Sequence, residues 1–363
     1  MGLSPLPTTA SPALPAPPPE QTWLKLVQAQ VEGALGELLE LPDEVRLDAR
    51  WTQALEQVRE YALRPAKRVR PALVLAGYCM ARGSTAVPSG LWRFAAGLEL
   101  LHTFLLIHDD VADKAALRRG GLALHHLLGA GRIGEDLAVV MGDHLFARSL
   151  EAMLGSELPG ASRVSRYYLG VCRHTAVGQY LDIDLSRTAL SQVGLFRALR
   201  VAHLKTARYS FSAPLVCGAM LAGADEALLV QLDRMGRHVG LAYQLQDDLI
   251  GLFGDARVAG KAGDGDFAQG KRTFPVLAAW ERASGTVRTE LETLWALPTE
   301  KKDDAALARA RRLVDQCGGR AATERMVARA SRAAQRGLLA LPNPGGVRDL
   351  LDALIRRLAH RAA

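Results

Sequence analysis

The sequence predicts an all-α protein that folds as a single large helical bundle, and three observations support this fold class. Hydrophobic residues make up 49% of the 363 residues and aromatic residues only 6%, in a mixture rich in Ala, Leu, Arg and Glu that favours helix over strand. From Trp23 onward, apolar residues recur at helical spacing. Neither an internal repeat nor a linker divides residues 21–363, so we expect one domain of about ten helices or more.

The first 20 residues differ in composition from the rest of the chain. They are rich in Pro, Ala, Ser and Thr and include three consecutive prolines, Pro17 to Pro19. A segment of this composition cannot bury a core, so residues 1–20 are expected to form a disordered tail. The segment lacks a basic stretch followed by an apolar run, and no secretory signal is therefore expected.

The predicted helices follow one another through the rest of the chain. Segments 70–82 and 91–108 are apolar on nearly every side, which predicts interior helices. Glycine and proline positions such as Gly83, Pro88 and Gly223 separate neighbouring helices. The predicted helical ranges are 23–40, 70–82, 91–108, 134–154, 166–185, 194–223, 225–254, 273–283, 303–316, 321–339 and 346–360.

The chain is basic, with a formal net charge of +7 and a pI of about 9.4. This balance is compatible with nucleic acid, an anionic membrane or anionic small substrates. Much of the arginine excess lies in the C-terminal third at helical spacing among Ala and Leu, which favours a solvated helix surface. Because no basic stripe is interleaved with aromatic residues, nucleic acid is not an expected partner.

Cysteine usage and hydropathy indicate a protein of a reducing, aqueous compartment. No apolar run reaches the ~18 residues needed to span a bilayer, so no transmembrane segment is expected. The longest run, 95–107, contains Glu99 and His102 and is predicted to be a buried helix. The cysteines lack the spacing of a metal site or disulfide framework, and free thiols in the cytoplasm are expected. They are Cys79, Cys172, Cys217 and Cys317.

A first acidic cluster closes the apolar segment that ends at His108. Asp109 and Asp113 are four residues apart, which places both on one face of a helix. Like charges at this spacing repel, and a divalent cation is the obvious compensation. Mg²⁺ suits such hard carboxylate oxygens, because it keeps several waters and takes further ligands from substrate phosphates. Charged helix ends are common, however, so this pair alone is weak evidence for a metal site.

A second acidic cluster follows the apolar run 239–243. Gln244 precedes the adjacent carboxylates Asp247 and Asp248. Two helices that each place aspartates after a buried run predict facing carboxylate clusters, which together could hold a group of Mg²⁺ ions. The competing interpretation is two unrelated helix ends.

Basic residues occur beside both acidic clusters and beside glycine-rich breaks. Acidic and basic groups that share one cavity are suited to phosphates bridged by metal ions. The candidates are Lys67, Arg68 and Arg70, then Arg118 and Arg119, Lys205 with Thr206, Lys261, and Lys271.

In combination and in order, these motifs resemble those of the trans-isoprenyl diphosphate synthase (polyprenyl synthetase) family, over nearly all of residues 25–360. The resemblance implies an isoprenoid-synthase-type helical bundle around a central apolar cavity. The matching motifs are Lys67 to Pro71 (GKRxRP), Glu99 with His102 (ExxH), Asp109 to Asp113 (DDxxD), Arg118 to Gly120 (RRG), Gln179 with Asp182 (GQxxD), Lys205-Thr206 (KT), Gln244 with Asp247-Asp248 (the second aspartate-rich motif) and Gly270 to Thr273 (GKxT).

The resemblance also implies roles for individual residues. About three Mg²⁺ ions per site would be held by Asp109, Asp113 and Asp247, with Asp110 and Asp248 in support. The allylic diphosphate would be held by Arg118, Lys205 with Thr206, and Lys271, assisted by Lys261 and Gln244. Isopentenyl diphosphate would be held by Lys67, Arg70, His102 and Arg119. The family further suggests a homodimer.

Four positions depart from the family pattern. The usual Gly-Gly before Lys67 is Pro65-Ala66, and Leu122 replaces the usual proline after RRG. Gly251 stands in place of the third aspartate of the second motif, and Asp264-Gly265-Asp266 replaces the commoner Gly-Asp-Asp order. None of these changes removes a group that the chemistry requires.

The activity implied by the resemblance is condensation of isopentenyl diphosphate with dimethylallyl, geranyl or farnesyl diphosphate. Phe104, five residues before Asp109, is either the floor that limits product length or an ordinary core aromatic. With Phe104 as floor, we expect a medium-chain all-trans product, C20 ahead of C15.

Four alternatives remain open at this point. They are a synthase of longer polyprenyl diphosphates, a class I terpene cyclase, a non-catalytic partner subunit of the same fold, and a basic nucleic-acid-binding helical protein.

Overall fold

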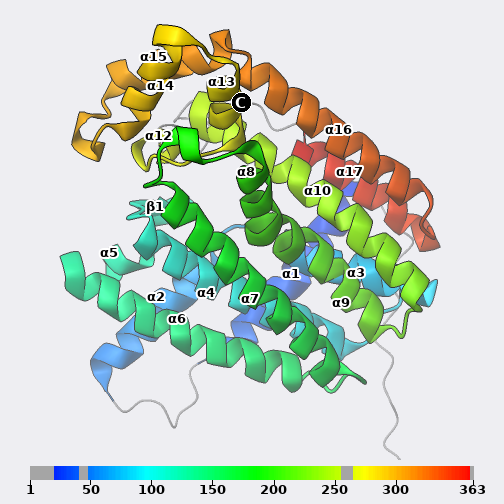
Figure 1. The fold of residues 1–363 in the computed structure, drawn as a ribbon. Helices are drawn as coiled ribbons and strands as arrows, with labels where there is room; N and C mark the ends of the chain where they lie inside the picture. The colour runs from blue at the N-terminus through cyan, green and yellow to red at the C-terminus, as the bar shows by residue number, and fades with distance from the viewer. Residues whose placement is uncertain (1–19, 41–47, 255–264, 360–363) are drawn as a thin grey trace, which may run out of the picture.

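A computed structural model describes residues 20–40, 48–254 and 265–359, and helices dominate this part of the chain (Figure 1). The predicted all-α class is confirmed. The longer helices are α1 (Glu20–Leu38), α2 (Ala49–Leu63), α3 (Val69–Arg82), α4 (Ser89–Ala112), α6 (Gly131–Leu154), α7 (Ala161–Leu185), α8 (Leu195–Val201), α9 (Ala213–Leu221), α10 (Glu226–Phe253), α13 (Phe274–Arg282), α14 (Gly285–Ala296), α15 (Asp304–Gln316), α16 (Gly319–Leu339) and α17 (Val347–Ala359).

Short elements connect these helices. A two-stranded antiparallel hairpin pairs β1 (Leu117–Arg118) with β2 (Gly121–Leu122). The others are α5 (Leu124–Leu128), α12 (Gly265–Ala268), the π-helix η3 (Ala202–Ser212) and the 3₁₀ turns η2 (Leu190–Gln192), η4 (Thr299–Lys301) and η5 (Pro344–Gly346). The predicted tail, apart from residue 20, and Lys261 lie outside the described residues.

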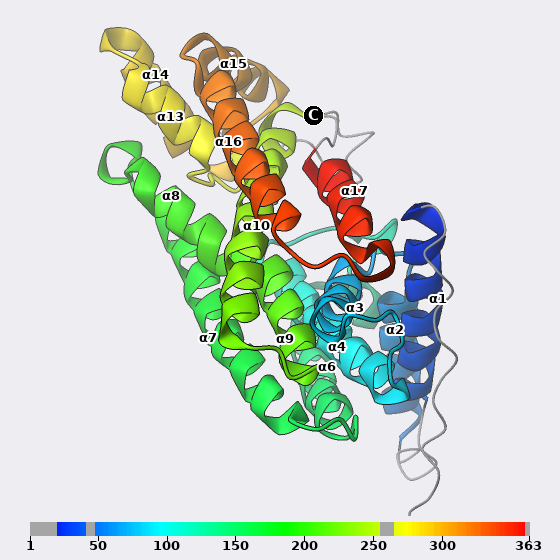
Figure 2. The same ribbon diagram turned by 90° about the vertical axis from the view of Figure 1, so that its right-hand side faces the viewer.

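The long helix α10 joins two groups of buried apolar residues. Its first half, with Leu232, Met235 and Val239, packs into the larger core, to which α1 to α7, α9 and α17 contribute. Its second half, with Leu245 and Leu252, packs into a smaller core with α13 to α16. In Figure 2, α10 runs down the middle, with α13 to α16 above it and α1 to α3 at one side. The carboxylates near the end of α10 therefore lie on a helix held by both cores.

Helix α4 is buried along most of its length because its residues are apolar on nearly every side. Leu91, Phe94, Leu98 and Leu101 are almost fully inaccessible to solvent, and α4 packs against α1, α3 and α6. By length and composition α4 could cross a membrane, but 67% of the relevant window is buried within the fold. It behaves as the core helix of a folded domain, as the sequence predicts.

Two glycines allow α3 and α9 to approach closely. A Cβ at Gly77 would collide with the backbone carbonyl of Leu215, and a Cβ at Gly218 would collide with that of Val74. Only residues without a side chain fit at both points of contact. Helix α3 is thereby fixed against the core, and Arg70 lies in its first turn.

The structure differs from the predicted helices in several places. The range 194–223 is not one helix but α8, the π-helix η3 and α9. Helices α2 and α14 were not predicted, because both carry many polar residues and their apolar faces are narrow. The hairpin at 117–122 was expected only as a glycine break, since two-residue strands carry no periodic signal.

Candidate active site

The first acidic motif lies at the C-terminal end of α4. Asp113 is the C-cap residue, and its backbone N–H donates to the carbonyl oxygen of Asp109 at 2.8 Å. Burial raises the pKa of Asp109 and the nearby Asp113 raises it further, whereas Lys205, Arg118 and Lys271 oppose the rise. Desolvated carboxylates that repel one another gain most from a bound cation.

Lys271 connects this motif to the segment that follows the second motif. Its Nζ lies 3.5 Å from Asp113 Oδ2 and 3.7 Å from Asp266 Oδ1. Burial alone would lower the pKa of Lys271, but Asp266, Asp182, Asp113 and Asp109 together raise it. The ammonium group is therefore fixed as a cation among these four carboxylates.

The second acidic motif lies in the last two turns of α10. Burial raises the pKa of Asp248 to about 8, and Asp266, Asp247 and Asp182 contribute to the rise, while a hydrogen bond from Gln244 opposes it. A Cβ at position 251 would collide with the Asp266 carboxylate. Asp266 thus places its carboxylate beside Gly251, the position at which the second motif lacks its third aspartate.

A short hydrogen-bond chain holds Asp248 from the π-helix. Thr206 Oγ1 donates to Gln244 Oε1 at 2.5 Å, and Gln244 Nε2 donates to Asp248 Oδ1 at 2.8 Å. These contacts fix the orientation of the Gln244 amide, whose nitrogen must face Asp248. Gln244 is therefore hydrogen-bonded to Thr206 and Asp248 within the protein, and the substrate contact expected for it stays a prediction.

Lys205, also in the π-helix, forms an ion pair with Asp182 of α7. Lys205 Nζ lies 2.7 Å from Asp182 Oδ2. Burial lowers the pKa of Lys205 but Asp182 and Asp109 raise it, and the net direction is upward. π-Helical turns often occur at functional sites because they rotate side chains out of α-helical register. Here the turn places Lys205 and Thr206 next to the acidic residues.

Asp110 has a different environment from its neighbours. It is fully buried, accepts a hydrogen bond from Tyr61 Oη at 2.8 Å, and pairs with Arg118, whose Nε lies 2.7 Å from Oδ1. Both carboxylate oxygens are thus satisfied by the protein. The Arg118 guanidinium is thus paired with Asp110 within the protein, and the metal-supporting role of Asp110 and the substrate contact of Arg118 stay predictions.

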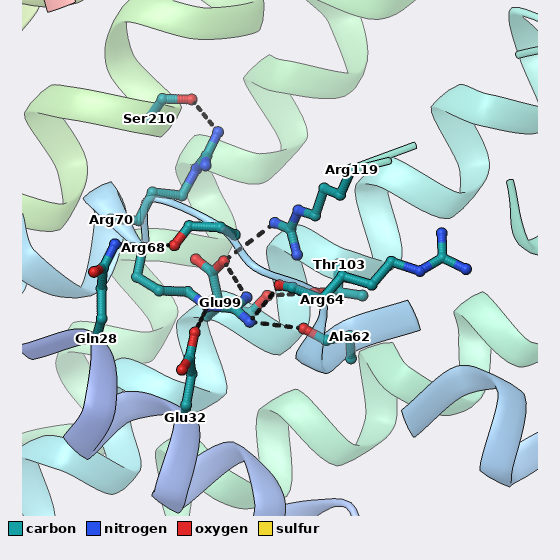
Figure 3. Close-up of polar contacts among 11 residues, drawn as sticks. Gln28, Glu32, Ala62, Arg64, Arg68, Arg70, Glu99, Thr103, Arg119 and Ser210 are labelled. Carbon is teal, nitrogen blue, oxygen red and sulfur yellow. Dashed lines mark hydrogen bonds and ion pairs between the residues drawn. The ribbon is translucent and has the colours of Figure 1, made fainter. Parts of the chain in front are cut away.

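A second basic cluster lies where α3 begins, facing α4 and the hairpin (Figure 3). Arg68 is buried; its Nη1 lies 3.0 Å from Glu99 Oε1, and its Nη2 donates to the carbonyl oxygen of Ala62 at 2.9 Å. Arg119 reaches the same Glu99 oxygen at 3.4 Å. Glu99 therefore holds two arginines from different elements at fixed positions.

Arg70 lies on the other side of this cluster, as Figure 3 shows. Its Nη2 donates to Ser210 Oγ at 2.6 Å, and its guanidinium lies 5.1 Å from the centre of the Tyr209 ring. Both contacts come from the π-helix. This distorted segment therefore carries Lys205 and also supports Arg70.

Four buried nitrogens of the cluster have no hydrogen-bond partner among the described residues, namely Nε of Arg68, Nε of Arg70, Nη1 of Arg119 and Nδ1 of His102. Of these, Nε of Arg68 lies 3.5 Å from the Glu32 carboxylate, and the other three have no ion pair at that atom within the described part of the chain. Burial lowers the pKa of His102, and the surrounding arginines, Arg70 and Arg119 foremost, lower it further. Buried polar atoms are rarely unpaired in folded proteins. Unpaired nitrogens within a positive cluster mark a place for an anion.

Two arginines of the site adopt left-handed backbone conformations. Arg119 (φ 52°) and Gly120 (φ 79°) are the two central residues of the hairpin turn, a combination that matches a type I′ turn. Arg68 has φ 45°. Such conformations cost about 1 kcal/mol or more for residues other than glycine and concentrate at functional sites.

The remaining candidates are placed less centrally. Lys67 is exposed at the turn before α3. Phe104 is half-buried on α4, with its ring centre 4.6 Å from that of His108 and 5.3 Å from that of Phe146 in α6. Within the described residues, no group of three His, Cys, Asp or Glu side chains is arranged to hold a metal ion by itself.

Several contributing residues received no role from the sequence. Asp182 and Glu99 belong to the GQxxD and ExxH motifs but received no individual role. Asp266 was recognised only as part of the altered order Asp264-Gly265-Asp266. Tyr61 and Arg64 carry no motif, and no local pattern could have indicated them, because their partners lie about 50 residues or more away along the chain.

Comparison with known proteins adds independent support. A family model described as polyprenyl synthetase matches residues 52–314. The chain belongs to the polyprenyl synthetase family. The synthetase is 33% identical over 287 residues to a geranylgeranyl diphosphate synthase of Mycobacterium tuberculosis, covering 78% of this chain and 77% of that protein. A geranylfarnesyl diphosphate synthase of Aeropyrum pernix is 32% identical, over 66% of this chain and 72% of its own.

Solved structures agree with this assignment. A geranylgeranyl pyrophosphate synthase from Corynebacterium glutamicum, complexed with isoprenyl diphosphate and magnesium, superposes with a TM-score of 0.85 at 28% identity, covering 93% of the synthetase and 99% of that chain. A decaprenyl diphosphate synthase from Rhodobacter capsulatus gives 0.80 at 27% identity, over 95% and 98%. The resemblance and the enzyme class predicted from the motifs are thus confirmed: the synthetase is a trans-prenyltransferase.

Proposed function

We propose that the synthetase condenses isopentenyl diphosphate with an allylic diphosphate and releases a medium-chain all-trans prenyl diphosphate, C20 in preference to C15. One observation carries this proposal. Lys271 links carboxylates of the two acidic motifs, and Arg70, Arg119 and His102 form a separate cluster with unpaired basic nitrogens. Two diphosphates, one with bound cations and one without, would match these two halves.

The acidic half suits Mg²⁺. Asp109, Asp113 and Asp247 would hold the ions, and Asp248 and Asp266 lie beside them. Because the described protein ligands do not close a metal site alone, water and substrate phosphate would complete the coordination, as Mg²⁺ prefers. When bound, Mg²⁺ would neutralise negative charge on the departing diphosphate.

Basic side chains of the protein would bind the substrates and stabilise the charge that develops. Lys271 and Lys205, both held as cations, would stabilise charge that develops on the leaving oxygen of the allylic substrate. Arg70, Arg119 and Lys67 would bind isopentenyl diphosphate, with neutral His102 donating a hydrogen bond. This anchoring would align the double bond with the allylic carbon. Proton loss to the departed diphosphate would complete the reaction, and no nucleophilic side chain is needed.

Product length would be set where α4 meets α6. Phe104 lies about one and a half helical turns before Asp109, and its ring packs on Phe146. A growing chain that extends from the acidic end of α4 along the helix would meet this aromatic pair. We therefore retain the C20 product as the proposal, with C15 and longer chains as the alternatives.

We further propose a cytoplasmic homodimer that forms through α6. Ile133, Leu137 and Val140 recur at helical spacing and are 60%, 41% and 53% exposed, so they form an apolar stripe. Large exposed apolar residues in a row are typical of a protein interface. Substitution Val140→Asp should yield a monomer in size-exclusion chromatography with light scattering, and an unchanged dimer would contradict this interface.

The test of function is direct. Purified protein is incubated with Mg²⁺, isopentenyl diphosphate and dimethylallyl, geranyl or farnesyl diphosphate, and the products are measured by mass. A C20 diphosphate is the expected main product. Cyclic hydrocarbons would favour a terpene cyclase, although residues 244–248 lack the second metal motif of that class. No product with any primer would indicate a non-catalytic subunit.

A further inference from the structure

Arg64, at the end of α2, joins the helix to the hairpin that carries Arg118 and Arg119. Its side chain is 7% exposed. Its Nη1 donates to the backbone carbonyl oxygens of Leu122 at 2.8 Å and Arg118 at 3.0 Å. One guanidinium nitrogen therefore bonds to both strands of the hairpin.

The other side of the same guanidinium is held by α2 itself. Nε and Nη2 of Arg64 lie 2.9 Å and 2.7 Å from the carboxylate oxygens of Glu60, one helical turn earlier. The guanidinium also lies 5.0 Å from the centre of the Tyr61 ring. A planar group with donors on two edges can make all of these contacts at once, whereas an ammonium group cannot.

The hairpin is shaped to receive this side chain. An ideal Cβ at Gly121 would lie 2.6 Å from Cζ of Arg64, so any larger residue there would displace the guanidinium. The hairpin has two residues in each strand and only one further backbone bond, from Ala123 N to Ala116 O at 3.0 Å. A hairpin of this size is marginal without outside support.

We propose that Arg64 is a positioning residue for substrate diphosphates, and this rests on the proposed function. By holding the carbonyls of Arg118 and Leu122, Arg64 fixes the hairpin, directs Arg118 to Asp110 and presents the unpaired Nη1 of Arg119 to the anion. Arg64 touches no substrate itself. Its contribution is that the strained turn at Arg119 is already formed when isopentenyl diphosphate arrives.

The test compares Arg64→Met and Arg64→Lys with Arg59→Met, an exposed arginine on the same helix. Binding of isopentenyl diphosphate is measured by calorimetry, and KM and kcat by product formation. We expect Kd and KM for isopentenyl diphosphate to rise by about tenfold in Arg64→Met, where two hydrogen bonds from a charged donor are lost. The rise should be smaller in Arg64→Lys and absent in Arg59→Met, and kcat should fall less than KM rises.

A control variant that is destabilised elsewhere distinguishes a general loss of stability from a loss of substrate positioning. Leu313→Ala removes a buried side chain of α15, far from the hairpin in Figure 1, and should lower the urea midpoint without weakening diphosphate binding. If Arg64→Met does not fold, Gly121→Ala approaches the same contact from the hairpin and should weaken binding likewise. Wild-type affinity in a folded Arg64→Met protein would overturn the proposal. Failure of the wild type to bind isopentenyl diphosphate would instead overturn the proposed function.

Discussion

The side-chain amide of Gln28 in α1 donates a hydrogen bond to the backbone carbonyl oxygen of Ala66 at 3.1 Å. One helical turn later, Glu32 lies 3.5 Å from Nε of Arg68. The N-terminal helix therefore supports the turn that contains Lys67. These two contacts hold the turn in place in a chain where Pro65-Ala66 stands at the position of the family's usual Gly-Gly.

Substitution Gln28→Leu should therefore raise KM for isopentenyl diphosphate about fivefold, since one hydrogen bond contributes about 1 kcal/mol. KM for the allylic substrate should stay the same, because Gln28 bonds to the turn before α3, which carries none of the acidic residues. Steady-state kinetics with each substrate varied in turn would measure this. Gln30→Leu, an exposed position on the same helix, is the control. Equal changes in both KM values would refute a specific effect on the turn.

The fold and much of the site follow from local patterns in the sequence. Helical periodicity located α3, α4, α6, α7 and α10, because an apolar face recurs over several turns in each. The spacing of Asp109 and Asp113 placed both at one helix end, as observed. Motif order then indicated that distant acidic and basic residues meet.

The partner of each charged group could not be predicted in the same way. Adjacent aspartates 109 and 110 read alike in the sequence, yet only 110 is paired with Tyr61 and Arg118. The π-helix was also unpredictable, because an extra residue in one turn leaves the hydrophobic period almost unchanged. Pairing depends on three-dimensional packing between segments distant in sequence, which periodicity does not encode.

The pair of Asp110 and Arg118 should stabilise the folded protein. Asp110→Asn leaves the largely buried Arg118 guanidinium without its paired carboxylate, and should lower the free energy of unfolding by about 3 kcal/mol. Urea denaturation monitored by circular dichroism would measure this. The control Asp136→Asn breaks an exposed pair with Arg132 and should change stability little. Similar midpoints for the two variants would show that the buried pair does not stabilise the fold.

The Asp266 carboxylate, which lies beside Gly251, should contribute to Mg²⁺ binding. Because Asp266 places its carboxylate beside Gly251, Asp266→Ala should weaken Mg²⁺ binding about tenfold in the presence of inorganic pyrophosphate, as one carboxylate near the ions is lost. Calorimetric titration with Mg²⁺ gives the affinity directly. Asp304→Ala, which removes an exposed carboxylate of α15, should have no effect.

The reciprocal variant sharpens this test. Adding Gly251→Asp to Asp266→Ala should recover part of the lost affinity, since a carboxylate then returns to the same region from α10. Gly251→Asp alone should lower stability, because its side chain would collide with Asp266. A stable single variant that binds Mg²⁺ more tightly than the wild type would contradict this arrangement.

Magnesium affinity should rise with pH. In the metal-free protein burial raises the pKa of Asp248 to about 8 and also raises that of Asp109, so protons compete with the cation at neutral pH. In the unfolded chain these groups ionise near 4. The metal-free protein should therefore lose stability as pH rises from about 4 through 8, and excess Mg²⁺ should restore it. Thermal melts at pH 6.0 to 8.5, with and without Mg²⁺ and pyrophosphate, would show a metal-induced shift that grows with pH; a shift that shrinks with pH would contradict this assignment.

Phe104 should limit the length of the product. Phe104→Ala removes one ring of the pair with Phe146 and should open space beyond the acidic end of α4, so that products longer than C20 form. Mass analysis of products from farnesyl diphosphate would detect them. Phe94→Ala is the matched control, because Phe94 lies in the same helix but is fully buried in the core; it should lower stability by about 3 kcal/mol without lengthening the product. Unchanged products in a folded Phe104→Ala protein would mean that Phe104 is only a core aromatic, and the limit on chain length would then have to come from another part of the cavity wall.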